Sequence, residues 1–275
     1  MNIIKEALYE TLSNSCAEAV PGDYTDEKTG LLVCGKCHGF KQHKLTICGE
    51  PITVKRCCPC DLESQKKEQE RLKKRALHLA IRQLREECIA DPAMRDKTFA
   101  SSRTSSQLEK GKAYVDHWAE MEKHNIGLLF WGPPGSGKTH AAACIANALI
   151  DKGIPAGMLS ISSLLAMPFE KRDVAIEKII QMPLLIIDDL NAERKTEYAM
   201  ETIFNLVDSR VRAGRPMIVT TNIIIDEIEK PTDLPHQRIY ERIHSDCPAV
   251  KFTETSYRNN HFKEKRSILN GIFAN

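Results

Sequence analysis

The chain has 275 residues, of which 28% are charged and 42% hydrophobic, and its net charge is +2 at pH 7. This composition is that of an ordinary soluble protein, with room for one large domain and a small one. The small net charge does not by itself indicate binding to nucleic acid, so any such binding has to come from local patches.

The chain is expected to stay in a reducing compartment. Its first residues carry charges where a signal peptide needs an apolar core, so we expect no secretion signal. No apolar run approaches the roughly 18 residues of a membrane span. Ten cysteines in such a chain favour metal binding over disulfides. We therefore predict a cytoplasmic protein with no membrane partner.

Six of the ten cysteines lie between Cys34 and Cys60, in a segment rich in glycine and lysine. Cys34 and Cys37 form one pair, and a second cluster at Cys57, Cys58 and Cys60 follows about twenty residues later. Two turns that each present two thiolates to a tetrahedral ion are typical of a zinc ribbon. Zn²⁺ would supply stability that so small an apolar core lacks.

The second pair of ligands is ambiguous from the residues alone. Cys57 with Cys60 gives a C-x2-C spacing, whereas Cys58 with Cys60 gives C-x-C. The alternative for the whole segment is a set of free or unrelated thiols. Further ligands in reach are His38, His43 and Cys48, while Cys16, Cys88, Cys144 and Cys247 are expected to be packing residues.

A charged segment from residue 61 to about residue 90 contains good helix formers and neither glycine nor proline. Its positions 71–85 carry six Lys or Arg and no acid, a run that is usually a solvated face. Asp91-Pro92 ends this predicted helix. One face is apolar, through Leu77, Ile81, Leu84 and Cys88. We expect a cysteine domain at 1–60, a basic helical linker at 61–105 and a nucleotide-binding domain at 106–275.

Short apolar runs alternate with helical segments from residue 126 onward. This alternation predicts a parallel sheet that is covered on both faces, hence an α/β fold. The expected helices cover residues 138–152, 162–181 and 196–213. The expected strands are Gly127–Trp131, Gly157–Ile161, Leu184–Ile187, Met217–Thr220 and Val250–Phe252.

The first of these strands runs into Gly132-Pro-Pro-Gly-Ser-Gly-Lys138-Thr139, which fits the P-loop pattern without a mismatch. Backbone N–H groups of such a loop and the following helix N-terminus hold phosphates. We expect Lys138 to reach the β- and γ-phosphates of ATP and Thr139 to hold Mg²⁺. The candidate nucleotide-binding residues here are Gly132, Pro133, Pro134, Gly135, Ser136, Gly137, Lys138, Thr139 and His140.

Two acids follow the apolar strand at Leu184–Ile187. The carboxyl ends of parallel strands are where ligands of open α/β sheets bind. Asp188 is expected to complete the Mg²⁺ shell, and Asp189 to orient or activate the attacking water. Aspartate is one methylene shorter than the glutamate usual at this position, so hydrolysis is expected to be slow. The alternative is that both acids only cap a turn.

Polar residues also follow the strand Met217–Thr220. The amide of Asn222 is placed to sense the γ-phosphate or the water, although a turn residue is the plainer interpretation. Arg238 and Arg242 are four residues apart and share a helix face, and planar guanidinium groups suit phosphate recognition. These arginines and Arg258 are candidates for the site; ordinary surface ion pairs are the alternative.

Together these segments resemble the DnaC/DnaI-type bacterial helicase loaders, with the IstB-type transposition helper ATPases as close relatives. The resemblance covers roughly residues 92–262. It is carried by the residues around the P-loop, by Leu184-Leu-Ile-Ile-Asp-Asp-Leu190, by Thr220-Thr-Asn222 and by Arg238-Ile-Tyr-Glu-Arg242. It implies an AAA+ ATPase domain, three-layered around a parallel sheet, that self-associates on ATP binding with each site between subunits.

The resemblance also implies roles for single residues. Arg242 looks like the finger that acts on the neighbouring subunit's ATP, Arg238 like its neighbour and Arg258 like a second sensor. A DNA-contacting segment is implied at 162–181, where Lys171 and Arg172 are the basic residues and Met167-Pro168 interrupts the helix. The C-x-C spacing of zinc-bearing loaders favours Cys34, Cys37, Cys58 and Cys60 as zinc ligands, with Cys57 as the alternative.

The expected function is therefore ATP-dependent loading of a DnaB-type replicative helicase onto single-stranded DNA. The cysteine domain would dock the helicase, although direct binding of nucleic acid is a rival role for it. Two other functions stay open. One is a transposition helper that binds duplex DNA, and the other is a passive adaptor with a purely structural nucleotide site.

Overall fold

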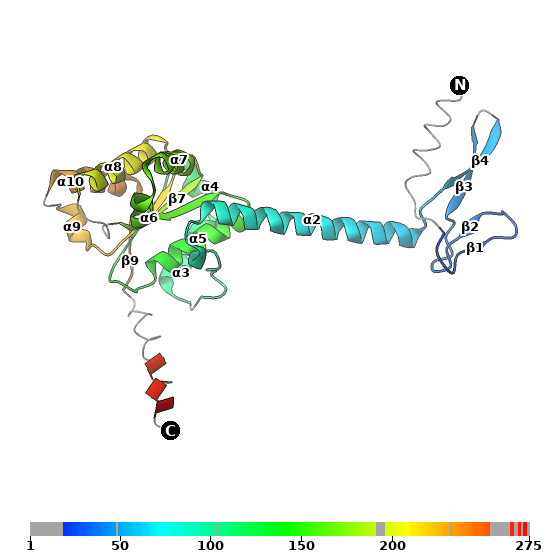
Figure 1. The fold of residues 1–275 in the computed structure, drawn as a ribbon, viewed down its shortest axis with the longest axis horizontal. Helices are drawn as coiled ribbons and strands as arrows, with labels where there is room; N and C mark the ends of the chain where they lie inside the picture. Colours follow the sequence, from blue (N-terminus) through cyan, green and yellow to red (C-terminus); the bar gives the residue numbers. More distant parts are fainter. Residues whose placement is uncertain are drawn as a thin grey trace. The chain divides into compact units, whose positions relative to one another are not determined.

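The computed structural model describes residues 19–47, 49–102, 104–190, 196–231 and 233–253, and residues 265, 266, 269, 270, 272 and 273. The chain divides into two compact units, Met1–Leu79 and Ala80–Asn275. The division falls inside the 30-residue helix α2 (Pro59–Cys88) (Figure 1). Cys48 and Arg258 lie outside the described residues.

The first unit consists of two small antiparallel sheets followed by the start of α2. Among the described residues of this unit, few apolar side chains are buried, Val33 and Val54 among them. The buried ammonium group of Lys41 donates to Asp23 at 2.7 Å, so part of its interior is ionic. The strands are β1 (Tyr24–Thr25), β2 (Leu32–Val33), β3 (Gln42–Ile47) and β4 (Glu50–Lys55).

The second unit is built on a five-stranded sheet in the order β6-β7-β8-β5-β9, in which every neighbouring pair is parallel. The sheet is covered on both faces, because the run Leu184–Ile187 and most other strand residues are buried. The strands are β5 (Leu128–Trp131), β6 (Ala156–Ser160), β7 (Leu184–Leu190), β8 (Met217–Thr221) and β9 (Ala249–Lys251). All five lie within one or two residues of the predicted strands, apart from the longer C-terminal end of β7.

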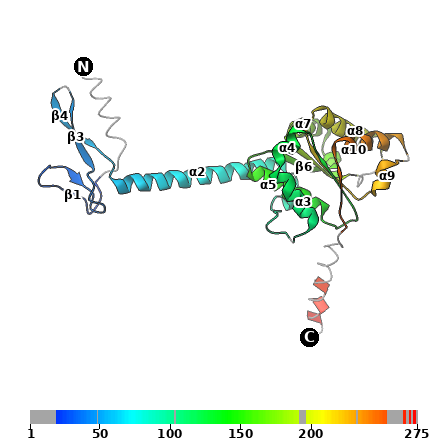
Figure 2. The ribbon, with the colours of Figure 1, turned by 180° about the vertical axis from the view of Figure 1, so that it is seen from behind.

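Helices form the other two layers of this unit (Figures 1 and 2). α5 packs on β6, β7 and β8 with α3 against it, while α10 packs on β5 and contacts α8, which contacts α7. The predicted three-layer α/β fold is thereby confirmed. The helices are η1 (Pro92–Met94), α3 (Ser106–Asp116), α4 (Trp118–Lys123), α5 (Lys138–Asp151), α6 (Ile161–Ala166), α7 (Phe169–Ile180), α8 (Glu197–Arg212), α9 (Ile225–Glu229) and α10 (Leu234–Asp246).

The predicted apolar face of α2 exists only at its C-terminal end. Ile81 and Leu84 pack against the core of the second unit and Cys88 is buried there, whereas Leu77 is 59% exposed. Among the described residues, no helix is both long and apolar enough to span a bilayer.

Candidate nucleotide site and candidate metal centre

The loop between β5 and α5 takes a backbone path that requires glycine. Gly132, Gly135 and Gly137 have φ angles of 142°, 79° and 97°, in the region that side chains disfavour. A Cβ on Gly132 would also lie 2.2 Å from the carbonyl oxygen of Phe252. α5 begins directly after this loop, so its free N–H groups and positive end face the loop. The local geometry is that of an anion-binding cradle.

Lys138 joins this loop to the end of a neighbouring strand. Its buried ammonium group donates to the carbonyl oxygens of Gly132 at 2.8 Å and Pro133 at 3.0 Å. It also donates to Oδ1 of Asn222, just beyond β8, at 2.8 Å. A cation is therefore fixed at the mouth of the loop, with an amide beside it.

Asp188 lies one strand further along the same edge. Burial raises the pKa of its carboxyl group above the ordinary value, and hydrogen bonds from the hydroxyl groups of Thr220 and Thr139 oppose that shift. The Thr220 hydroxyl donates to Oδ1 of Asp188 at 2.7 Å. Asp188 and Thr139 thus offer a carboxylate and a hydroxyl oxygen next to each other, which is a donor set that suits Mg²⁺.

Asp189 is held in a left-handed backbone conformation with φ of 59°. Its N–H donates to the hydroxyl of Thr220 at 2.9 Å, and its Oδ1 accepts from the amide of Asn222 at 3.0 Å. A continuous chain of hydrogen bonds therefore runs from Lys138 through Asn222 to Asp189. The sequence analysis gave no role to Thr220, whose hydroxyl positions both acids. Its place beside the polar residues at the end of β8 was the only sequence feature that could have indicated this role.

The remaining loop residues differ in what their side chains do. Ser136 has a buried hydroxyl with no hydrogen-bond partner among the described residues, as expected of a group that faces a ligand. The His140 ring instead points to Ser102, with Nε2 and the Ser102 hydroxyl 2.6 Å apart. The imidazole of His140 therefore belongs to the packing of α5 against the segment before α3.

Arg238 and Arg242 share one face of α10, as predicted. Both guanidinium groups stack on the ring of Phe204 in α8, at 4.5 and 4.6 Å from its centroid. Nε of Arg242 donates to the buried carboxylate of Asp208 at 2.6 Å. Asp208 and Phe204 were not predicted as site residues. Nothing in the sequence of α8 indicates that these two side chains orient an arginine of α10.

The predicted DNA-contacting segment is divided at Met167-Pro168 into α6 and α7, as its sequence indicated. Arg172 does not present a cation to solvent. Its guanidinium is buried and donates to the carbonyl oxygens of Leu164, Leu165 and Met167 at the end of α6. Arg172 is therefore unavailable for the DNA contact that the resemblance implies, because the helix break creates free carbonyl groups that this side chain satisfies.

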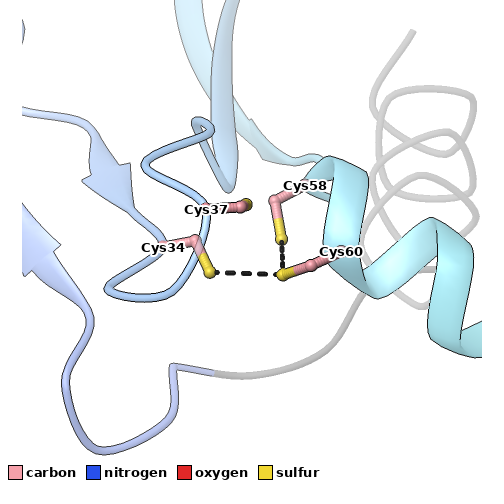
Figure 3. A group of neighbouring side chains, drawn as sticks. All are labelled: Cys34, Cys37, Cys58 and Cys60. Carbon is pink, nitrogen blue, oxygen red and sulfur yellow. Dashed lines mark hydrogen bonds between the residues drawn. The ribbon is translucent and has the colours of Figure 1, made fainter.

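In the first unit, four thiols converge at the start of α2 (Figure 3). Cys34 and Cys37 come from the loop after β2, and Cys58 and Cys60 come from the residues that begin α2. All four sulfur atoms lie within 4.8 Å of one another, and Sγ of Cys60 is 3.5 Å from Cys34 and 3.2 Å from Cys58. A tetrahedral ion with metal–sulfur bonds of about 2.3 Å requires sulfur atoms about 3.8 Å apart, so the cluster has the size of a metal site.

Hydrogen bonds to the Cys37 sulfur from the backbone N–H groups of Cys60 and Gly39 lower the pKa of its thiol to about 6. Such donors stabilise a thiolate, the form that binds metal. The alternative ligand Cys57 is not part of the cluster, and its sulfur accepts from the Gln65 amide at 3.7 Å. The ring of His38 pairs with the Tyr24 hydroxyl at 3.2 Å, outside the four thiols.

Comparisons with known proteins identify the family of this chain. The profile of the family described as IstB-like ATP binding protein matches residues 61–265. The replicative helicase loader DnaC of Escherichia coli strain K12 is 27% identical over 160 residues, which are 55% of this chain and 63% of the loader. The match thus spans less than two thirds of that relative. A putative insertion sequence ATP-binding protein of Sinorhizobium fredii is 33% identical over 100 residues, 34% of this chain and 33% of that protein.

Solved structures show the same fold. A crystal structure of DnaI has a TM-score of 0.50 at 20% identity and covers 62% of this chain and 95% of DnaI. A crystal structure of the DnaC helicase loader has a TM-score of 0.51 at 19% identity and covers 59% of this chain and 100% of that structure. These comparisons confirm the predicted AAA+ P-loop fold and the predicted resemblance to DnaC/DnaI and IstB proteins.

Proposed function

Because the chain belongs to the IstB-like ATP binding protein family, we propose that it is an ATPase that loads a replicative DNA helicase onto single-stranded DNA. Two observations support this proposal. The first is the hydrogen-bonded chain from Lys138 through Asn222 to Asp189 beside a P-loop. The second is the similarity to the DnaC loader, which is restricted to part of each protein.

We infer the following roles at the nucleotide site. The loop Gly132–Gly137 and the start of α5 bind the phosphates through backbone N–H groups, and Lys138 neutralises the β- and γ-phosphates. Thr139 and Asp188 hold Mg²⁺, which when bound neutralises charge on the phosphate oxygens. The carboxylate of Asp189 orients the attacking water, and Asn222 holds that carboxylate while contacting the γ-phosphate.

Arg242 is proposed to act on the ATP of a neighbouring subunit. Asp208 and Phe204 already fix its guanidinium in one protomer, so little conformational freedom is lost when a second protomer presents ATP. Arg238 shares the same aromatic support and lies beside it. Arg258, the third proposed arginine, lies outside the described residues. This arrangement requires self-association, which ATP binding would favour and hydrolysis would reverse.

The four thiols of Cys34, Cys37, Cys58 and Cys60 are proposed to bind Zn²⁺. The size of the cluster and the N–H groups that stabilise a thiolate at Cys37 support a metal-binding role. The described part of the first unit buries few apolar side chains, so the ion would contribute to folding there. We propose that this metal-bound unit docks the helicase.

A pull-down with the replicative helicase of the same organism tests the loader function. Wild-type protein is expected to retain the helicase in an ATP-dependent manner, and Lys138→Ala is expected to abolish that dependence. Retention that is identical with and without ATP, and identical in the variant, would favour a passive adaptor. The absence of any retention by folded, metal-loaded protein would overturn the loader function.

A transposition helper is the second candidate, and the similarity to a putative insertion sequence ATP-binding protein favours it. Such a helper is expected to bind duplex DNA only when ATP is present and to recruit a transposase. ATP-dependent binding that prefers duplex over single-stranded DNA, without helicase retention, would support this candidate.

A further inference from the structure

Cations recur along one face of α2, within the part of the helix that belongs to the first unit. Lys67, Arg71, Lys74 and Arg75 follow one another at intervals of four, three and one residue, so they share about 100° of arc and about 12 Å of helix axis. We call these four residues the basic stripe. All four are exposed, and the side chains of Lys67 and Arg71 are 73% and 61% accessible.

The charge of the basic stripe is not neutralised within its unit. Lys74 and Arg75 have no ion-pair partner among the described residues, and residues 71–85 include no acid. Lys67 and Arg71 pair with Glu63 and Glu68, each at 2.6 Å. These two pairs are exposed, and such pairs are weak enough for a stronger anion to replace the carboxylate.

The chemistry of the face identifies the kind of anion. α2 contains no phenylalanine, tyrosine or tryptophan, and the imidazole of His78 is the only ring on the face of the stripe. The stripe therefore lacks the large aromatic platforms that bind unstacked bases and the aromatic anchors that hold a protein partner. The exposed leucines nearby, Leu72, Leu77 and Leu79, project outside the arc of the stripe. A row of cations without such groups matches a phosphate backbone, which is bound by charge alone.

We propose that the basic stripe binds the phosphate backbone of duplex DNA, without regard to sequence and without a requirement for ATP. Duplex DNA carries one negative charge per about 1.7 Å of its axis, and its binding is driven by counterion release. The proposal stands on the geometry of α2 and is independent of the nucleotide site.

Two variants of the full-length, metal-loaded protein test the proposal. Lys74→Gln/Arg75→Gln removes two charges from the stripe, and Lys66→Gln/Lys73→Gln removes two exposed charges from the opposite face of the same helix. Glutamine has nearly the helix propensity of lysine, so both variants should keep α2 helical. Binding of a fluorescent mixed-sequence duplex and of a matched single strand is measured by anisotropy, without nucleotide and at several salt concentrations.

The stripe variant is expected to bind duplex about tenfold or more weakly than wild type, with a salt slope shallower by about 1.8, since each lost phosphate contact removes about 0.9. The opposite-face variant should stay within about twofold of wild type, and Lys138→Ala should bind duplex normally. Equal losses in both double variants would overturn the proposal. Tighter binding of the single strand than of the duplex would also overturn it. The absence of duplex binding at low salt would overturn it as well, and would make the stripe a solvated face. Normal duplex binding by the stripe variant, with retention of an acidic protein lost instead, would assign the stripe to a protein partner.

Discussion

Lys138 and Asn222 are joined directly: the ammonium group of the P-loop lysine donates to the amide oxygen of Asn222 over 2.8 Å. The amide nitrogen of Asn222 then donates to Asp189 at 3.0 Å. Lys138 is the first residue of α5 and Asn222 follows β8, 84 positions away. An amide that is anchored on both sides keeps one orientation, so its donor group is fixed toward the acid proposed to position water.

Replacing Asn222 with alanine is expected to lower the rate of ATP hydrolysis while ATP binding persists. The variant loses the donor to Asp189, but the loop and Lys138 still hold the phosphates. We expect kcat to fall by about 10- to 100-fold, with nucleotide affinity within about threefold of wild type. Steady-state hydrolysis and titration with a fluorescent ATP analogue measure the two quantities. A loss of affinity equal to the loss of rate would assign Asn222 to binding.

Asp189 is a sharper test of the hydrolytic site, because its backbone is left-handed. Asparagine tolerates this conformation, so Asp189→Asn should fold normally and lose roughly 10²-fold in kcat through loss of the carboxylate. Asp189→Glu adds the methylene that is usual at this position, but glutamate tolerates a φ of 59° less well. We therefore expect no gain in kcat from Asp189→Glu. A higher kcat would contradict the inference that the left-handed backbone at this position disfavours glutamate.

Arg242→Ala is expected to spare ATP binding and to reduce hydrolysis by roughly 10³-fold if the arginine acts across a subunit interface. Mixing Arg242→Ala with Lys138→Ala should restore part of the activity, because one subunit then supplies the arginine and the other the intact P-loop. Lys138→Ala mixed with Asp189→Asn should stay inactive, since both changes affect residues of the same subunit's site. Equal activity in the two mixtures would contradict the proposal that Arg242 acts on the ATP of a neighbouring subunit.

The nucleotide unit was largely predictable because its signals are local in the sequence. An apolar run, a glycine loop and a helix former follow one another within about 25 residues, and each strand of the sheet is a short apolar run. The two acids near the end of β7 and the amide after β8 could be placed at one edge, because parallel strands align their carboxyl ends. The common contact of Asp188 and Asp189, the hydroxyl of Thr220, could not be placed, since it depends on the register between β7 and β8.

The residues that were not predicted take their roles from distant partners. Asp208 acts on Arg242, which is 34 positions away, and the buried Arg172 answers to carbonyl groups exposed by the break before α7. The sequence marks both as ordinary charged helix residues. Spacing alone left two choices for the second thiol pair. The structure brings together the set with Cys58, because the turn into α2 directs its sulfur toward Cys60.

Arg210 is expected to be among the most important side chains for stability. It is fully buried, and its guanidinium makes five hydrogen bonds to the carbonyl oxygens of Ile180, Met182, Pro183 and Pro216. Arg210→Met would remove all five hydrogen bonds, leaving Pro216 with the N–H of Leu185 as its donor, and lower the free energy of unfolding by about 3 kcal/mol or more. Urea denaturation measures this change. Arg215→Met, which removes one hydrogen bond at the same edge, should cost less than about 1 kcal/mol.

The zinc content of variants tests whether the four clustered thiols, and not Cys57, bind the metal. Cys34→Ala/Cys37→Ala removes half of the proposed ligands, so the purified variant should contain less than about a tenth of an equivalent of zinc, against about one in wild type. Cys57→Ala should keep its zinc, because Cys57 lies outside the cluster. The double variant should also lose helicase retention while binding ATP normally, since the two units fold around separate cores. The assignment of these ligands would be contradicted if purified wild-type protein contained no zinc, or if Cys57→Ala lost its zinc.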